Sequence, residues 1–321
     1  MNKTKLLSVV VPVYNESEVL NAFYERIKNV MDELPGFYYE LIFVDDGSKD
    51  DSYNLLVKLG KLDENIKVVK LSRNFGHQTA ITAGIDIAMG DAVVLIDSDL
   101  QDPPEIINEF IEKWKEGFDV VYGVRKKRKG ESRMKRFTAS IFYRLLKSLI
   151  NIDIPVDTGD FRLMSRRIVD QFKELNENDR FVRGLISWLG YNQVGVYYDR
   201  DERYAGETKY PYRKMIKFAL DGITSFSSFP LKLSTFLGYA TSIFAFLYAI
   251  NIFVQKLLGY TVEGLATVVI GMLFLGGVQL ICLGIIGEYI GRIFNETKKR
   301  PLYVIDHIYN SQSTVSKNEN L

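Results

Sequence analysis

The pattern of apolar and polar positions divides the chain of 321 residues into two unlike parts. Up to about residue 210, short apolar runs alternate with segments in which apolar residues recur at helical spacing. Between about residues 229 and 290 the chain is mostly apolar. The pattern therefore predicts an α/β domain that is followed by long apolar helices.

Five short apolar runs in the first part predict β-strands, at 6–14, 39–48, 66–72, 91–99 and 118–125. Four segments with helical periodicity lie between them, at 18–34, 50–62, 76–90 and 103–117. Strands that alternate with helices indicate a mostly parallel sheet with helices on both faces, and near-continuous apolar strands fit burial on both sides. We expect this α/β domain to span residues 1–210.

Polar clusters follow the predicted strands. They are Tyr14-Asn15-Glu16, Asp45-Asp46-Gly47, Arg73-Asn74, Asp97-Ser98-Asp99 and Gly123-Val124-Arg125. The carboxyl ends of parallel strands meet at one edge of a sheet, where such folds bind their ligands. Helix caps and ordinary loop polarity are the alternative explanation, and they can account for Ser48, Asp50 or Asp51. We expect the five clusters to line one ligand site.

Carboxylates crowd the end of the fourth predicted strand. Asp97 and Asp99 occupy alternate residues, and Asp102 follows closely. If the chain stays extended, the side chains of Asp97 and Asp99 share one face. Two hard oxygen donors suit Mg²⁺ or Mn²⁺. The sequence has neither a GxxxxGK[ST] nor a GxGxxG phosphate loop, so we expect a divalent ion to hold a diphosphate here.

The composition excludes several other classes of site. A formal net charge of +1 gives no indication of a nucleic-acid partner, and none is expected. Cys282 is the one cysteine, which excludes an intramolecular disulfide and fits a reducing compartment or a membrane interior. Neither His77 nor His307 has the spacing of a zinc site.

Two apolar segments, 229–254 and 264–290, each provide the roughly 20 residues that cross a hydrocarbon core of about 30 Å. Buried core helices are the alternative, but two such lengths in succession favour a transmembrane hairpin. Basic residues precede the first segment and follow the second, whereas the join carries only Lys256. The positive-inside rule then predicts a multi-pass protein of the cell membrane, with the α/β domain and both termini in the cytoplasm.

The segments beside this hairpin have patterns of their own. Residues 211–228 combine apolar positions at helical spacing with basic residues, which predicts an interfacial amphipathic helix, and a plain connector helix is the alternative. Glycines between Gly271 and Gly291 allow close helix contact, so we expect a homo-oligomer. Residues 291–321 are expected to form a cytoplasmic tail, in which "RPLYVIDH" (300–307) could add a strand at the domain's edge.

The motifs at the strand ends resemble glycosyltransferase family two, which has the GT-A fold, a Rossmann-like mostly parallel sheet. The match rests on "VVPVYNE" (10–16), "VDDGS" (44–48), "RNFG" (73–76), "DSDLQDPPE" (97–105) and "YGVR" (122–125). Further motifs resemble the polyprenyl-phosphate glycosyltransferases of that family, which include bactoprenol glucosyltransferases and, more distantly, dolichol-phosphate mannose synthases. These are "DTGDFRLMSR" (157–166), "RYAGETKYPYRKM" (203–215), "FSSFPL" (226–231) and "GEYIGRIFNETKKRPLY" (287–303). The resemblance covers nearly the whole chain.

This resemblance implies the inverting transfer of one sugar from a UDP-sugar to a polyprenyl phosphate such as undecaprenyl phosphate, for modification of cell-envelope glycans. It implies that Asp99 and Gln101 bind Mg²⁺ or Mn²⁺. It also implies a set of residues that contact the donor nucleotide: Pro12, Tyr14, Glu16, Asp45, Asp46, Arg73 and Asp97. A carboxylate can accept a hydrogen bond from the uracil N–H, and Tyr14 can pack beside the base, although core packing is an alternative role for it.

On the acceptor side, Arg125, Arg203 and Lys209 are expected to bind the lipid phosphate, since guanidinium and ammonium groups both bind phosphate. The resemblance implies an acceptor-side carboxylate, either Asp160 or Asp157, that acts as a base or orients the acceptor. We favour Asp160, because a turn or a helix cap is an alternative role for Asp157. The segment that holds both shows little helical or strand pattern. Together with Asp99, they are the expected catalytic residues.

The sequence leaves the transferred sugar open. Glucose and N-acetylglucosamine are the leading candidates and galactose-type sugars are possible, because selectivity depends on a few hydroxyl contacts. Two other functions are alternatives. A processive polysaccharide synthase usually has a QxxRW signature and more spans, and "RFVRGLISWLG" (180–190) lacks that signature. A non-catalytic membrane scaffold has no need for the intact acidic motifs.

Overall fold

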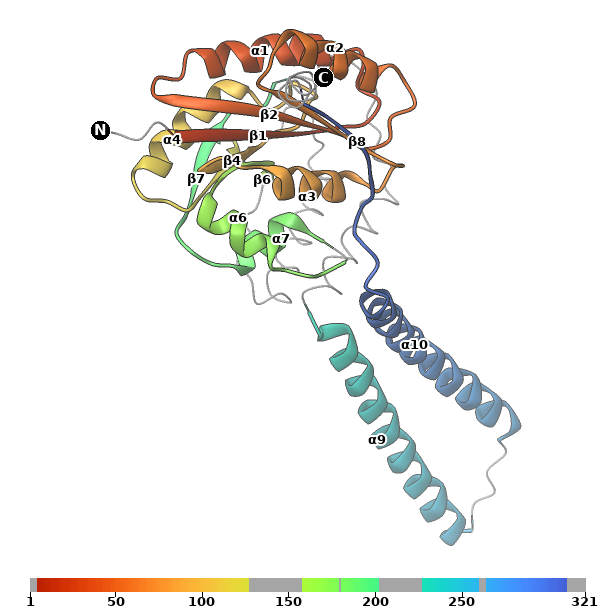
Figure 1. Cartoon of the computed structure of the whole chain (residues 1–321). Coiled ribbons are helices and arrows are strands. Elements are labelled where there is room, and N and C mark those ends of the chain that lie inside the picture. The colour runs from red at the N-terminus through yellow and green to blue at the C-terminus, as the bar shows by residue number, and fades with distance from the viewer. Residues whose placement is uncertain (1–4, 127–157, 179, 202–226, 260–263, 311–321) are drawn as a thin grey trace. The chain divides into compact units, whose positions relative to one another are not determined.

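The computed structural model describes residues 5–126, 158–178, 180–201, 227–259 and 264–310. The chain divides into two compact units. One comprises Met1–Arg144, Ile152–Tyr210 and Pro301–Leu321, and the other comprises Leu145–Asn151 and Pro211–Arg300. The first unit is an α/β domain, and the second contains two long helices (Figure 1).

An eight-stranded sheet forms the centre of the described part of the α/β domain. Its strands, in spatial order, are β7 (Gln193–Tyr198), β5 (Val120–Arg125), β6 (Thr158–Ser165), β4 (Ala92–Leu95), β1 (Lys5–Val13), β2 (Phe37–Asp45), β3 (Ile66–Leu71) and β8 (Ile305–Asn310). Neighbouring pairs among β4, β1, β2 and β3 are parallel, as are β5 and β7, whereas β6 and β8 run antiparallel to their neighbours. The five predicted strands and the mostly parallel arrangement are confirmed.

Helices cover both faces of this sheet (Figure 1). One face carries α1 (Leu20–Asp32), α2 (Ser52–Leu62), the short 3₁₀ helix η1 (Pro104–Ile106) and α4 (Ile107–Lys115). The other carries α3 (His77–Ile87), α6 (Arg166–Lys173) and α7 (Val182–Trp188). Alternate residues of β1 face opposite layers, as expected for a strand buried on both sides. Val9 and Val11 join the core with α1, while Val10 lies under Gly84 of α3.

β6 is one of two strands, with β7, that the sequence did not predict. It lies between β4 and β5, and all eight of its residues are buried. Its polar members include Asp160 and Arg162, which interrupt the apolar pattern by which a buried strand is recognised. The expectation of an irregular segment here is therefore wrong. Because β6 is antiparallel to β4 and β5, its first residue, Thr158, pairs with Val124 near the end of β5.

β8 returns the chain to the α/β domain after the two long helices. It pairs with β3 at the edge of the sheet, which confirms the strand expected around "RPLYVIDH". Lys70 Nζ lies 3.0 Å from Asp306 Oδ2 across this pair. The Tyr303 hydroxyl donates to Asp86 Oδ2 of α3 at 2.8 Å. Residues from Pro301 onward thus belong to the α/β unit.

The second unit contains α9 (Phe229–Leu257) and α10 (Leu265–Thr297). Both helices are long and apolar enough to cross a membrane, judged by length and composition. They contact each other at Cys282, whose thiol lies 3.7 Å from the Ser234 carbonyl, and the Tyr289 hydroxyl of α10 donates at 2.6 Å to the carbonyl of Ser227, two residues before α9. Each helix extends beyond the apolar segment predicted for it. The predicted interfacial helix at 211–228 lies outside the described residues except at its last two positions.

Candidate active site

The loops after β1, β2 and β3 meet at the carboxyl edge of the sheet. The backbone N–H of Asn15 donates to Ser48 Oγ at 3.0 Å, and Asn15 Oδ1 accepts from the N–H of Lys49 at 2.8 Å. Gly47 has a φ of +66°, and a Cβ on it would lie 2.5 Å from the carbonyl carbon of Arg73. Only glycine allows this approach without displacing backbone. The first three predicted clusters therefore lie together.

The two acids at the end of β2 are both buried, yet they differ in their contacts. Asp46 accepts from the N–H groups of Phe75 and Gly76, at 2.7 and 2.9 Å, one on each oxygen. Asp45 accepts from the N–H of Ser48 through Oδ1 at 3.2 Å, and its Oδ2 has no hydrogen-bond partner in the described part of the chain. Burial raises the pKa of both carboxyls. Asp46 thus holds the loop after β3, whereas Asp45 presents an oxygen suited to a ligand donor.

The chain does not stay extended through the DSD motif. β4 ends at Leu95, and Ser98 and Asp99 lie in a turn. Asp99 Oδ1 accepts from the backbone N–H of Gln101 at 3.2 Å, and Leu100 has a φ of 59°. The extended arrangement considered for Asp97 and Asp99 is therefore not adopted, because the local hydrogen bond of an aspartate favours a turn.

Negative charge is concentrated around Asp97. Burial raises the pKa of its carboxyl to about 6, and the carboxylates of Asp160, Asp102 and Asp99 act in the same direction. His77 opposes them, with Nε2 at 3.5 Å from Asp97 Oδ1. A carboxylate whose pKa is raised by neighbouring acids gains from an added cation. The electrostatics of this edge thus favour a positively charged ligand.

Asp99 and Gln101 are the predicted metal ligands. Gln101 Oε1 accepts from Arg200 Nη2 at 2.7 Å, and an amide oxygen keeps a second lone pair for a cation. Among the described residues, no group of three or more His, Cys, Asp or Glu side chains is arranged to hold a metal ion. Mg²⁺ commonly takes one or two carboxylates and completes its shell with water and substrate phosphates. The residues present therefore fit an ion that arrives with a diphosphate.

Arg125 neutralises part of the acidic charge. Its Nη2 lies 3.4 Å from Asp102, which is buried, and the Tyr198 hydroxyl donates to the same carboxylate. Despite burial, Asp102 and Tyr198 hold the pKa of Arg125 above its usual range. Arg125 thus lies at the end of β5, at the edge of the sheet where the site was expected, and its guanidinium pairs with the Asp102 carboxylate.

Asp160 lies in the most strongly cationic surroundings of the described site. Its Oδ1 is 3.0 Å from Arg183 Nε, and its Oδ2 is 3.1 Å from Gln78 Nε2 and 3.4 Å from His77 Nε2. Burial opposes ionisation of Asp160, but Arg183 and His77 hold its pKa well below the usual range. Burial also disfavours the charged form of His77, but Asp97 and Asp160 raise its pKa to about 9. Near neutral pH, Asp160 is thus an anion and His77 a cation.

The structure brings the described members of the predicted site to one edge of the sheet. Pro12 lies near the end of β1, where its carbonyl is 3.5 Å from Ser98 Oγ, and Tyr14 and Glu16 follow that strand. The Arg73 guanidinium lies over the Phe75 ring, 4.0 Å from its centroid. Three predicted residues lie outside the described part of the chain: Asp157, Arg203 and Lys209.

Sequence reasoning missed three residues of this site. His77 and Gln78 directly follow the "RNFG" motif, which was a usable signal. Arg183 has no local signal, because nothing near it in the sequence indicates a partner on β6.

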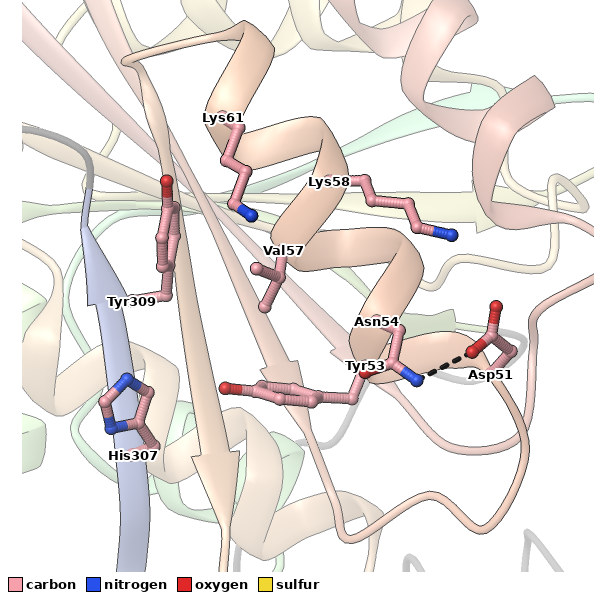
Figure 2. A pocket seen from close by; sticks show the side chains of 8 residues that line it. All are labelled: Asp51, Tyr53, Asn54, Val57, Lys58, Lys61, His307 and Tyr309. Carbon is pink, nitrogen blue, oxygen red and sulfur yellow. Dashed lines mark hydrogen bonds between the residues drawn. The ribbon is translucent and has the colours of Figure 1, made fainter.

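A separate hollow of about 430 Å³ lies between α2 and β8 (Figure 2). Its lining consists of Asp51, Tyr53, Asn54, Val57, Lys58, Lys61, His307 and Tyr309. None of the predicted site residues is among them, so this hollow and the candidate site are different features.

Comparison with known proteins places the chain among glycosyltransferases. The model of the family "Glycosyl transferase family 2" matches residues 8–172, and that of the "GtrB C-terminal hairpin" matches residues 229–293. Glycosyltransferase YkcC of Bacillus subtilis is 54% identical over 303 residues, which are 94% of each chain. The bactoprenol glucosyl transferase of Shigella phage SfV is 43% identical over 300 residues, 93% of this chain and 97% of that protein.

A prophage bactoprenol glucosyl transferase homolog of Escherichia coli is 42% identical over 303 residues, 94% of this chain and 99% of that protein. Among solved structures, mannosyl-3-phosphoglycerate synthase from Rubrobacter xylanophilus aligns with a TM-score of 0.49 and 16% identity, over 68% of this chain and 71% of that one. The predicted fold class, a GT-A-like α/β domain followed by two apolar helices, is confirmed. The chain therefore belongs to glycosyl transferase family 2 and carries the C-terminal hairpin of the GtrB type.

Proposed function

We propose that this glycosyltransferase transfers a single sugar from a UDP-sugar to a polyprenyl phosphate such as undecaprenyl phosphate. The observation that carries the proposal is the joining of a family 2 domain to a GtrB-type hairpin in one chain. Relatives that match over 93–94% of this chain are named bactoprenol glucosyl transferase or its homolog. Glucose and N-acetylglucosamine are the sugars that we propose first.

The hairpin brings the reaction to the membrane where such a lipid resides. In the proposed topology, α9 and α10 both cross the bilayer, and residues 1–210 and 291–321 lie in the cytoplasm. The basic residues that flank the hairpin support this orientation. Residues 211–228 are proposed to lie at the membrane surface, and we expect the protein to form homo-oligomers through its glycine-containing second span.

Asp45 is the residue that we propose to read the donor base. Its buried Oδ2, without a hydrogen-bond partner in the described part of the chain, is suited to accept from the N3–H of uracil. Pro12, Tyr14 and Glu16 would border the nucleoside from β1 and the loop that follows it. Arg73 and Asp97 would flank the ribose and diphosphate, while Asp46 acts through the loop after β3 that it holds.

Asp99 and Gln101 are proposed to hold a Mg²⁺ or Mn²⁺ ion together with the donor diphosphate. When bound, this ion supplies charge that stabilises the departing UDP. The high density of carboxylates at this edge supports the assignment, because the pKa of Asp97 is raised to about 6 by burial and neighbouring acids.

In the proposed reaction, an oxygen of the lipid phosphate attacks the anomeric carbon from the side opposite UDP. A new bond forms from that oxygen to the carbon as the bond to the β-phosphate oxygen breaks, and the electron pair leaves with UDP. An α-linked donor then gives a β-linked product. The phosphate monoester is already anionic near neutral pH, so it needs orientation and charge neutralisation more than a base.

The residues near the lipid phosphate can be given roles from their charge and surroundings. Because its pKa lies well below the usual range, Asp160 is suited to orient neighbouring cations and poorly suited to take a proton. Arg125 is proposed to supply positive charge to the lipid phosphate from the end of β5. Arg203 and Lys209, outside the described residues, keep their proposed role as phosphate ligands, and Asp157 remains the alternative acceptor-side carboxylate.

The proposal is tested by incubating the purified full-length protein with undecaprenyl phosphate and a panel of UDP- and GDP-sugars, and identifying lipid products by mass. One sugar per lipid, formed only with Mg²⁺ or Mn²⁺, is expected. Asp99→Asn should abolish transfer, whereas Asp170→Asn, on the exposed face of α6, should leave it unchanged. Long polymers would favour a processive synthase, and no turnover a scaffold. Full activity in excess chelator, or transfer only to water-soluble acceptors, would refute the proposal.

A further inference from the structure

Gln78 links three elements at the acceptor side of the site. It lies in the first turn of α3, and its Nε2 donates to Asp160 Oδ2 at 3.1 Å. Its Oε1 accepts from the backbone N–H of Val182, the first residue of α7, at 2.9 Å. The side-chain amide of Gln78 thus connects α3 to both β6 and α7, because its N–H and its oxygen each form a hydrogen bond.

Arg183 holds the same aspartate from the opposite oxygen. Its Nε lies 3.0 Å from Asp160 Oδ1, and its Nη1 donates to the Thr158 carbonyl at 2.7 Å. The Asp160 side chain is 9% exposed and that of Arg183 is 24% exposed, so solvent screens this ion pair only weakly. A single guanidinium therefore fixes both the side chain of Asp160 and the backbone two residues before it.

Two further arginines immobilise the start of β6. Arg162 Nε donates to the Asp160 carbonyl at 3.3 Å, and its Nη2 donates to the Gly159 carbonyl at 3.0 Å. Arg125 approaches the same backbone, since a Cβ on Gly159 would lie 2.6 Å from Arg125 Nη2. Guanidinium groups from β5, β6 and α7 thus converge on the first three residues of β6. These contacts fix the backbone that carries the Asp160 side chain.

We propose that Gln78 and Arg183 are positioning residues that fix the Asp160 carboxylate for the attack of the lipid phosphate. The inference rests on the proposed function, because the lipid phosphate is the nucleophile of that reaction. Asp160, held from both sides, in turn contacts His77, whose Nε2 lies between Asp160 and Asp97. The side chain of His77 is 41% exposed, so it presents positive charge to the site from a position set by both acids.

The two residues should differ in the size of their effect. Arg183 places a full positive charge 3.0 Å from Asp160 in a weakly screened ion pair, whereas Gln78 offers the carboxylate an uncharged amide N–H. A displacement of about 1 Å at a reacting group costs on the order of 10²-fold in rate. We therefore expect Arg183→Met to lower kcat by about 10²-fold and Gln78→Leu by about 10-fold. Arg183→Lys, which keeps the charge without the planar fork, should recover part of the loss.

The test compares these variants with the wild type and with Arg167→Met. Arg167 is an exposed arginine of α6 that lies over the Tyr191 ring, and its loss should leave activity unchanged. Steady-state rates with undecaprenyl phosphate give kcat and the KM of the donor. A second assay, without lipid, measures slow hydrolysis of the UDP-sugar by water. A positioning role predicts a lower kcat, a donor KM within about twofold of wild type, and unchanged hydrolysis.

Three results would overturn the inference. They are a kcat of Arg183→Met and Gln78→Leu within about twofold of wild type, a parallel loss of donor binding and hydrolysis, and no recovery in Arg183→Lys. If Arg183→Met does not fold, Gln78→Leu decides the question, because it removes no charge and only the hydrogen bonds to Asp160 and to the N–H of Val182. A wild-type protein that makes no lipid-linked sugar refutes the proposed function itself, which is a different outcome from active wild type with unaffected variants.

Discussion

The buried carboxylate of Asp45 gives a sharp test of how the donor base is recognised. Because Oδ1 already accepts from the N–H of Ser48, an asparagine at this position keeps its oxygen there and places its NH₂ where Oδ2 now lies. In Asp45→Asn, a donor then faces the N3–H of uracil. The variant loses a hydrogen bond to a charged group, which contributes about 1.5–3 kcal/mol. We expect UDP to bind about 10- to 150-fold more weakly.

The same substitution should not destabilise the free protein. Asp45 buries a charge with one oxygen unpaired in the described structure, and a neutral amide of the same shape costs less to bury. The melting temperature of Asp45→Asn should therefore equal or exceed that of the wild type. A large loss of stability would show that Asp45 serves the fold, and that the weaker binding has an indirect cause.

Methylating the base isolates this contact. N3-methyl-UDP cannot donate to Asp45, so the wild type should bind it about as weakly as Asp45→Asn binds UDP. Titration calorimetry of both proteins with both nucleotides completes a double-mutant cycle. If Asp45 accepts from N3–H, methylation should cost the variant much less than it costs the wild type. An equal cost in both proteins would refute the reasoning.

Two further predictions concern the scaffold of the site. Gly84→Ala should lower the free energy of unfolding by about 1–2 kcal/mol. Its Cβ would lie 2.2 Å from Val10 Cγ1, and overpacking near the upper end of its usual range of about 1–3 kcal/mol exceeds the roughly 1 kcal/mol that alanine adds to a helix; an unchanged denaturant midpoint would contradict it. Glu40 accepts from Ser8 Oγ and Lys67 Nζ, both at 2.5 Å, and despite burial these contacts hold its pKa below its ordinary value of 4.5. The stabilisation by the Glu40 carboxylate is therefore present above pH 4.5 and is lost as the pH falls through its lowered pKa. Glu40→Gln should lower the free energy of unfolding by about 1.5–3 kcal/mol at pH 7 and by progressively less in acid, as followed by melting temperature. A difference between variant and wild type that stays constant across pH would refute the assignment.

The strand ends show what the sequence can predict. Apolar runs followed by "YNE", "DDGS" and "DSD" correctly placed β1, β2 and β4, because a buried strand and the polar loop after it form a recognisable pattern within a short stretch of sequence. The apolar segments at 229–254 and 264–290 likewise predicted α9 and α10, since length and composition are local properties.

Contacts between residues that are far apart in the sequence produce no such local pattern. Gln78 and Asp160 are 82 residues apart, and Gln78 and Val182 are 104 apart, so no spacing rule joins them. β6 escaped prediction because its buried Asp160 and Arg162 interrupt the apolar pattern: Asp160 contacts Gln78 and Arg183 from other elements, and Arg162 donates to backbone carbonyls of β6 itself. The turn at Asp99 was also missed, because a two-residue spacing does not distinguish a strand from a turn.

The place of β8 in the chain sets an order of events during synthesis. β3 cannot acquire its outer neighbour until the ribosome has passed both apolar helices and reached the last strand. In the proposed topology, the edge of β3 stays unpaired while α9 and α10 enter the membrane, so the sheet is completed only after the chain has reached the bilayer. A truncated fragment that stops before α9 would keep that edge bare, so a shortened version needs residues 301–310 joined back to it.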